Sequence, residues 1–153
     1  MSPKTVMISG LSGLVGACTL TLIHETARRT IPHAPRMDVL GMRALAKTLR
    51  KVDVLPPNDD RLHTITLVGD IISNAAYYSA VGLGRPEGAL VRGTLLGLAA
   101  GVGAVFLPGP LGLGSAPSSR TNATKAMTVG WYTAGGIVAA VAYRFLARKN
   151  DES

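Results

Sequence analysis

The stretch TVMISGLSGLVGACTLTLI, residues 5–23, contains no Asp, Glu, Lys or Arg. Three further blocks share this property: residues 71–84, 93–119 and 126–143. The overall composition is not distinctive, because 47% hydrophobic residues and a mean hydropathy of +0.29 also fit a soluble domain. The charged residues instead gather in residues 28–61, in short loops and in the tail. This segregation predicts a polytopic membrane protein.

The expected fold is an all-α integral membrane bundle that forms a single domain over residues 1–153. We expect four transmembrane helices at about residues 5–27, 62–84, 86–107 and 124–146, and an amphipathic interfacial helix at about residues 37–52. Turn signals set these limits, with Pro56-Pro57 before the second span and Pro108-Gly109-Pro110 after the third. The single cysteine, Cys18, excludes a disulfide bond within the chain.

The first span has a second interpretation, as a signal peptide. Lys4 supplies a charged start, and Val15-Gly16-Ala17-Cys18 resembles the lipobox at which bacterial lipoproteins are cleaved and acylated. A lipoprotein normally continues from its Cys as a polar tether, whereas residues 19–23 continue the apolar run. We therefore expect this segment to remain as a span.

Eight of the sixteen basic residues lie between the first and second spans. The positive-inside rule then places the connector 28–61 in the cytoplasm and both termini outside, and the expected location is a bacterial inner membrane. In the interfacial helix the apolar residues share one side, and the basic face consists of Arg36, Arg43, Lys47, Arg50 and Lys51. This face is expected to meet a bilayer with anionic headgroups. No aromatic platform accompanies it, so nucleic-acid binding is not expected.

The second span carries a polar stripe along its length. At 100° per residue, one face presents His63, Thr66, Asp70, Ser73, Asn74, Tyr77 and Tyr78. A carboxylate near the centre of a span costs about 2.5 to 3.5 kcal/mol on insertion scales, so Asp70 must face protein, water or a partner. It is either a functional group or an interhelical contact worth about 0.6 kcal/mol. The possible charge partners near the stripe are Arg92, Glu25, Arg28 and His24.

Small residues recur at four-residue spacing on three of the expected spans. The positions expected to allow close helix packing are Gly93, Gly97, Gly101, Gly13 and Gly136. Four helices enclose little volume, so a conduit of useful width is expected between protomers of a homo-oligomer.

The expected function is binding or conduction of a small polar solute, proton or cation through the polar stripe centred on Asp70. One alternative is a non-catalytic accessory or assembly subunit of a larger membrane complex. Another is a membrane enzyme that acts on a lipid or quinone at the cytoplasmic headgroup level, through His24, Glu25, His33 and His63.

Motif spacing favours a protein without enzyme activity, cofactor or metal. His24, Glu25, His33, Asp38 and His63 are of metal-ligand type, but they lack the spacing of known metal sites. Nucleophilic triads, P-loops and dinucleotide fingerprints do not occur in the sequence, so no catalytic residue is assigned.

Overall fold

The computed structural model describes residues 2–151, with side chains up to residue 148. The described part contains no strand and consists, in chain order, of α1 (Pro3–Thr30), α2 (Met37–Lys51), α3 (Asp59–Tyr78), the 3₁₀ helices η1 (Ser79–Gly82) and η2 (Pro86–Gly88), α4 (Ala89–Phe106), α5 (Ala116–Ser119) and α6 (Asn122–Asp151). The expectation of an all-helical chain is therefore confirmed. Three stretches are long and apolar enough to cross a membrane: Pro3–Thr30, Pro86–Phe106 and Asn122–Arg148.

Local sequence explains where the helices start and stop. The Ser2 hydroxyl caps α1 by accepting a 3.2 Å hydrogen bond from the Thr5 amide. The helix ends at Thr30, and the next residue, Ile31, is extended because it precedes a proline. Asn58 caps α3 by accepting from the Arg61 amide at 3.1 Å, and two aspartates follow in its first turn.

The segment expected as the second span differs from a single long helix. The α-helix ends at Tyr78, and residues 79–82 form a 3₁₀ turn. Arg92 of α4 donates to the Val81 carbonyl at 2.8 Å and to the Arg85 carbonyl at 2.9 Å, so a side chain satisfies the carbonyls of this irregular backbone. The length and composition needed for a span are thus met at three places in the described chain rather than four.

The directions of the helices follow from their contacts. A side-chain carbon added at Gly101 would lie 2.7 Å from Val129 Cα, whereas one at Gly93 would meet Gly136 and Ala140, so α4 and α6 are antiparallel. Gly16 meets Gly135 and Ala139 of α6, whereas the ring of His24 makes an edge-on contact with the ring of Tyr132, so α1 and α6 are antiparallel too. As a result α1 and α4 run in the same direction.

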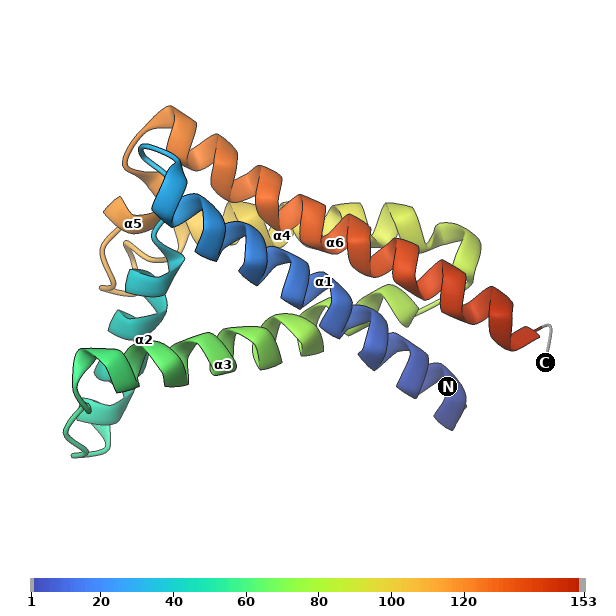
Figure 1. Cartoon of the computed structure of the whole chain (residues 1–153), viewed down its shortest axis with the longest axis horizontal. Coiled ribbons are helices and arrows are strands. Elements are labelled where there is room, and N and C mark those ends of the chain that lie inside the picture. The colour runs from blue at the N-terminus through green and yellow to red at the C-terminus, as the bar shows by residue number, and fades with distance from the viewer. Residues whose placement is uncertain (1, 152–153) are drawn as a thin grey trace.

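The third helix runs back along α1 in the opposite direction. Gly13 lies against Ser79 just after the end of α3, and Glu25 lies near His63 close to its start. Figure 1 shows that α3 diverges from α1, so that the two helices form a wedge, and that α2 lies across the open side of this wedge. Both chain ends lie at one end of the molecule, and α2 and α5 lie at the other.

Glycines allow close contacts between the helices of the bundle. A side-chain carbon added at Gly97 would lie 2.6 Å from the Tyr132 carbonyl oxygen. One added at Gly13 would lie 2.7 Å from the Ser79 amide nitrogen. Gly136 and Gly93 lie directly against each other's backbone. All five glycines that were expected to support packing lie at contacts of this kind, and each contact is within one chain.

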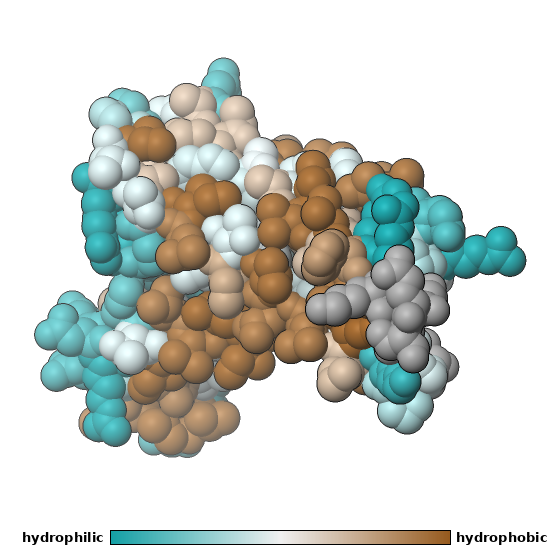
Figure 2. Space-filling model, turned by 45° about the vertical axis from the view of Figure 1, so that its right-hand side comes forward, coloured by the Kyte–Doolittle hydropathy of each residue, from teal (hydrophilic) through white to brown (hydrophobic). Residues whose placement is uncertain are grey.

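The outer surface carries a belt of exposed apolar side chains. Leu22 of α1 and Phe145 of α6 are each 68% exposed, and Ile72 of α3 and Leu95 of α4 are 64% and 60% exposed. Figure 2 shows this brown belt between two hydrophilic ends. Soluble monomers rarely expose a contiguous apolar area of this kind, so the belt is consistent with an integral membrane protein.

Candidate functional site

A small polar cavity lies in the wedge between α1 and α3. Its volume is about 30 Å³, enough for about one or two water molecules. The second helix borders it on the open side of the wedge, and one residue of α6 borders it at the back. It is lined by Leu20, Thr21, His24, Glu25, Met37, Asp38, His63, Thr66, Leu67, Asp70, Asn74 and Tyr132. The cavity therefore lies within one chain.

Three buried polar atoms on the cavity wall have no hydrogen-bond partner among the described residues. They are His24 Nε2, His63 Nε2 and Thr66 Oγ1. An unpaired buried polar group costs about 1 to 3 kcal/mol, so such groups are rare and call for an explanation. Here the three atoms come from two helices and line one cavity. The arrangement suits a small guest that both donates and accepts hydrogen bonds.

Asp70 reaches the cavity because α2 has a glycine where the two helices touch. A side-chain carbon added at Gly41 would lie 3.4 Å from Asp70 Oδ2 and in steric conflict with the Thr66 methyl group. The carboxylate thus lies over the bare backbone of α2. A larger residue at position 41 would separate α2 from α3 and open the cavity to its surroundings.

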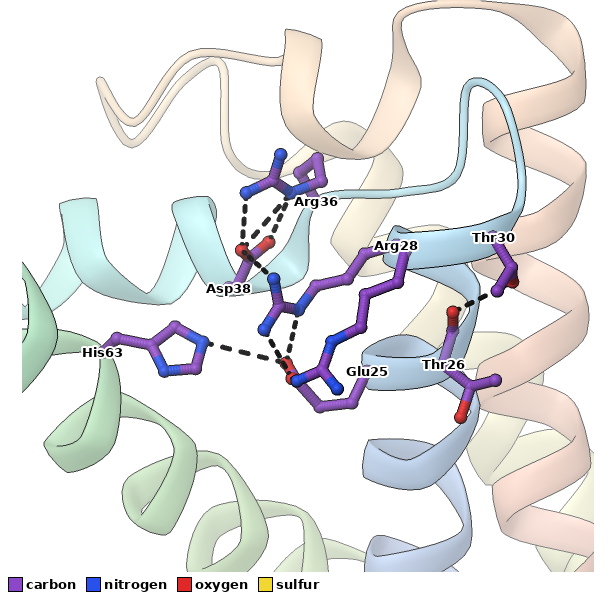
Figure 3. Close-up of polar contacts among 8 residues, drawn as sticks. Glu25, Thr26, Arg28, Thr30, Arg36, Asp38 and His63 are labelled. Atoms are coloured by element: carbon purple, nitrogen blue, oxygen red, sulfur yellow. Dashed lines mark hydrogen bonds and ion pairs between the residues drawn. The ribbon is translucent and has the colours of Figure 1, made fainter.

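One side of the cavity is formed by a chain of ion pairs, shown in Figure 3. Glu25 accepts two hydrogen bonds from Arg28, at 2.8 and 2.6 Å, and Arg29 lies 3.1 Å from the same carboxylate. His63 Nε2 lies 3.7 Å from the Glu25 carboxylate, which is too long for a hydrogen bond. Arg28 also lies 3.9 Å from Asp38 and so links α1 to α2.

Asp38 completes this chain at the start of α2. Its side chain is 6% exposed and accepts hydrogen bonds from Arg36 at 2.7 and 2.9 Å. Burial by itself raises the pKa of the Asp38 carboxyl, but hydrogen bonds from Arg36 and the Val39 amide, with the charges of Arg36 and Arg28, outweigh it. The pKa of Asp38 is therefore held below its usual 3.8.

This depressed pKa predicts an acid-sensitive attachment of α2. A carboxylate with a lowered pKa in the folded state contributes stability above its ordinary pKa, and that contribution is lost as the pH falls through the folded-state value. Asp38→Asn should reduce the free energy of unfolding by about 1.5 to 3 kcal/mol near neutral pH, the value of hydrogen bonds to a charged group. Thermal unfolding of both proteins in detergent as a function of pH checks this. The two melting temperatures should converge in acid, and a constant difference would contradict the assignment.

The residues of the polar stripe of α3 lie in three environments. His63, Thr66, Asp70 and Asn74 line the cavity. Tyr78 is buried and donates a 2.7 Å hydrogen bond to the Tyr132 carbonyl of α6. Ser73 and Tyr77 lie on the exposed side, where Tyr77 donates to the Leu96 carbonyl of α4 at 3.0 Å.

The remaining candidate residues lie elsewhere. Arg92 bonds to backbone carbonyls near η1, and His33 lies 3.1 Å from Arg120, which follows α5. No group of three metal-ligating side chains in the described part of the chain is close enough to hold a metal ion. On the basic face of α2, Arg36 bonds to Asp38, and Arg43 and Lys47 donate to loop carbonyls.

Sequence reasoning gave no site role to Thr21 and Tyr132, two polar residues of the cavity lining, or to Gly41, where α2 packs against Thr66 and Asp70. The signal for Gly41 was available, because a glycine inside an amphipathic helix costs about 1 kcal/mol relative to alanine and so has a structural reason. Tyr132 had no local signal, because it reaches the cavity from α6 and its ring lies 5.6 Å from His24. Comparison with family models, curated proteins and solved structures finds no match to this chain.

Proposed function

We propose that the chain is a membrane protein that binds and releases a proton at Asp70, through the small polar cavity that this residue shares with His24, His63 and Thr66. The single observation that carries the proposal is the set of three unpartnered buried polar atoms around one cavity beside a carboxylate. An ionisable residue inside a membrane bundle is most often part of a proton or ion pathway.

The size of the cavity favours a proton over a larger solute. A volume of about 30 Å³ holds about one or two waters and leaves no room for an organic molecule. Two imidazoles and a carboxylate can exchange a proton through such water, whereas a dehydrated metal ion needs several ligand oxygens or nitrogens at short range. Since the cavity lies within one chain, the proposal does not require the homo-oligomer expected from sequence.

We further propose that α3 crosses the membrane as a fourth span. Because α1 and α4 run in the same direction, the chain between them has to return across the bilayer. The 20 residues of α3 extend about 30 Å, which matches the hydrocarbon thickness. Its outer face is apolar, with Ile65, Val68 and Ile72 exposed, so its polar residues can turn inward while lipid meets the other side.

The same arrangement supports a cytoplasmic position for the end that holds α2. Arg120, between α5 and α6, and Lys125, in the first turn of α6, join the basic residues of the connector at this end. The cavity then lies nearer the cytoplasmic side, and the positive-inside rule gives the orientation.

Replacing Asp70 by Asn tests the proton site directly. The full chain is reconstituted into liposomes that contain a pH-sensitive dye, and a potassium diffusion potential drives proton entry. We expect wild-type liposomes to acidify faster than empty ones, and Asp70→Asn liposomes to behave as empty ones do, because the amide keeps the shape but cannot bind a proton. Asp59→Asn, an exposed position in the first turn of the same helix, is the matched control and should acidify as wild type does.

Infrared spectroscopy of the reconstituted protein supplies the second readout. The carboxylic acid band of a protonated Asp70 should appear as the pH is lowered, and it should be missing from Asp70→Asn. Equal acidification by wild type and Asp70→Asn, together with no difference in this band, would overturn the proposal. If Asp70→Asn instead removes a co-purifying membrane protein without changing proton entry, the chain is an accessory subunit.

A further inference from the structure

A second, much larger hollow lies on the other side of α2, away from Asp70. Its volume is about 800 Å³, and we call it the basic groove. One wall is α2, and the other is formed by the start of α3 and the loop that follows α4. The residues that line it are Val39, Met42, Arg43, Ala46, Lys47, Arg50, Lys51, Pro56, Pro57, Asp59, Leu62, Gly112 and Leu113.

The charge of the basic groove is strongly positive, with four cations from α2 and one carboxylate, Asp59. Two of the cations are held in place, because Arg43 donates to the Leu113 carbonyl at 2.9 Å and Lys47 donates to the Leu111 carbonyl at 2.6 Å. Each keeps further N–H groups for a ligand. Arg50 and Lys51 continue the row at exposed positions one turn further along α2. The groove is therefore suited to an anion with several acceptor oxygens, such as a phosphate.

The rest of the basic groove is apolar, which identifies the kind of phosphate compound. The partly exposed side chains of Val39, Met42 and Leu113 lie among the cations. The chain just before Pro56 exposes Leu55 at 89% and Val54 at 48%. A free phosphate would leave these side chains in contact with water. A molecule with a phosphate at one end and hydrocarbon at the other would cover both.

From this combination we propose that the basic groove is a discrete binding site for one anionic phospholipid. The phosphate lies against the cations of α2, and the acyl chains pass Val54 and Leu55 onto the apolar outer face of the bundle. This differs from general attraction of a basic helix to a charged membrane, because the loop after α4 forms one wall of the site. The proposal is independent of the proton site at Asp70.

Thermal unfolding of the full chain in neutral detergent, titrated with phosphatidylglycerol or phosphatidylcholine, tests the site. We expect phosphatidylglycerol to raise the melting temperature in a saturable way and phosphatidylcholine to have little effect. Arg50→Gln/Lys51→Gln should weaken the apparent affinity for phosphatidylglycerol about 30-fold, since each cation near an anionic lipid contributes about 1 kcal/mol.

Two further variants distinguish a site from surface attraction. Arg120→Gln/Lys125→Gln removes the same charge at the same end of the molecule but outside the groove, and it should keep the wild-type affinity. Ala46→Phe keeps every charge and fills the groove, and it should weaken binding. Melting temperatures without lipid identify any variant that has lost its fold, and the remaining variants still decide the question.

Three outcomes would overturn the proposal. Equal stabilisation by both lipids would show that the headgroup charge is not recognised. Equal losses in the two double variants, with no loss in Ala46→Phe, would show attraction without a site. Stabilisation by inorganic phosphate at the same concentration as phosphatidylglycerol would show that the groove binds free phosphate and that the apolar wall is not used.

Discussion

Gly97→Ala is expected to prevent α4 from packing on α6 and to destabilise the bundle by about 3 kcal/mol or more, at the upper end of the cost of overpacking. The added methyl carbon would lie 2.5 Å from Thr133 Cα and 2.6 Å from the Tyr132 carbonyl oxygen. Both neighbours are backbone atoms, so no change of rotamer relieves the conflict. The two helices have to move apart along a contact that also includes Gly93 and Gly101. Thermal or denaturant unfolding of the detergent-solubilised chain measures the loss.

The matched control is Gly103→Ala on the same helix. There the added carbon would meet only the Leu107 side chain, at 3.4 Å, so the space is available. Alanine in place of an unconstrained helical glycine stabilises by about 0.4 to 1 kcal/mol through the lower entropy of the unfolded chain. The two substitutions should therefore change the melting temperature in opposite directions. Similar changes from both would mean that the glycine contact is not what limits the approach of α4 and α6.

The separation between charged and charge-free segments predicts most of this fold because hydrocarbon imposes it directly on the sequence. The expected spans 5–27, 86–107 and 124–146 correspond to α1, to η2 with α4, and to α6. The break after Tyr78 was not predictable in this way. It depends on Arg92, a residue of the next helix, which supplies donors to the carbonyls of Val81 and Arg85. Hydropathy along the chain contains no information about such a contact.

The residues of the cavity were predictable to a similar extent, because spacing along one helix can be read from the sequence and contacts with other helices cannot. Helical periodicity places His63, Thr66 and Asp70 on one face of α3 because it depends only on spacing along the helix. It cannot say which neighbour meets each part of that face. Ser73 and Tyr77 have the same polar character but lie on the exposed side of α3, whereas Asn74, between them in sequence, lines the cavity.

Small-residue spacing raises a related ambiguity. Gly13, Gly93, Gly97, Gly101 and Gly136 allow a close helix neighbour, but the sequence does not say whether that neighbour belongs to the same chain or to another copy. In the structure each of them meets a helix of its own chain. These glycines therefore give no independent reason to expect a partner copy, and the oligomeric state is a separate question for measurement.

Cysteines placed at the start of α3 and in η2, after the end of α3, are expected to react from opposite sides of the membrane. Asp60→Cys lies in the first turn of α3 and Glu87→Cys lies in η2, and both positions are exposed. The background carries Cys18→Ala, so that the introduced thiol is the only one. Under the proposed orientation, a membrane-impermeant thiol reagent should label Glu87→Cys in intact cells and Asp60→Cys in inside-out vesicles, and each should be protected in the other preparation.

The directions of the helices explain why the two cysteines should be labelled from opposite sides. Because α1 and α4 run in the same direction, α1 ends on the side of the membrane opposite to the one where α4 begins, and α3 has to carry the chain back across. A helix with polar residues can make that crossing only if its charged groups face the protein. Full labelling of both cysteines after detergent addition shows that each thiol is reactive in itself. If both react from the same side in intact membranes, α3 does not cross, Asp70 lies outside the hydrocarbon region, and the cost that makes this carboxylate a functional candidate no longer applies.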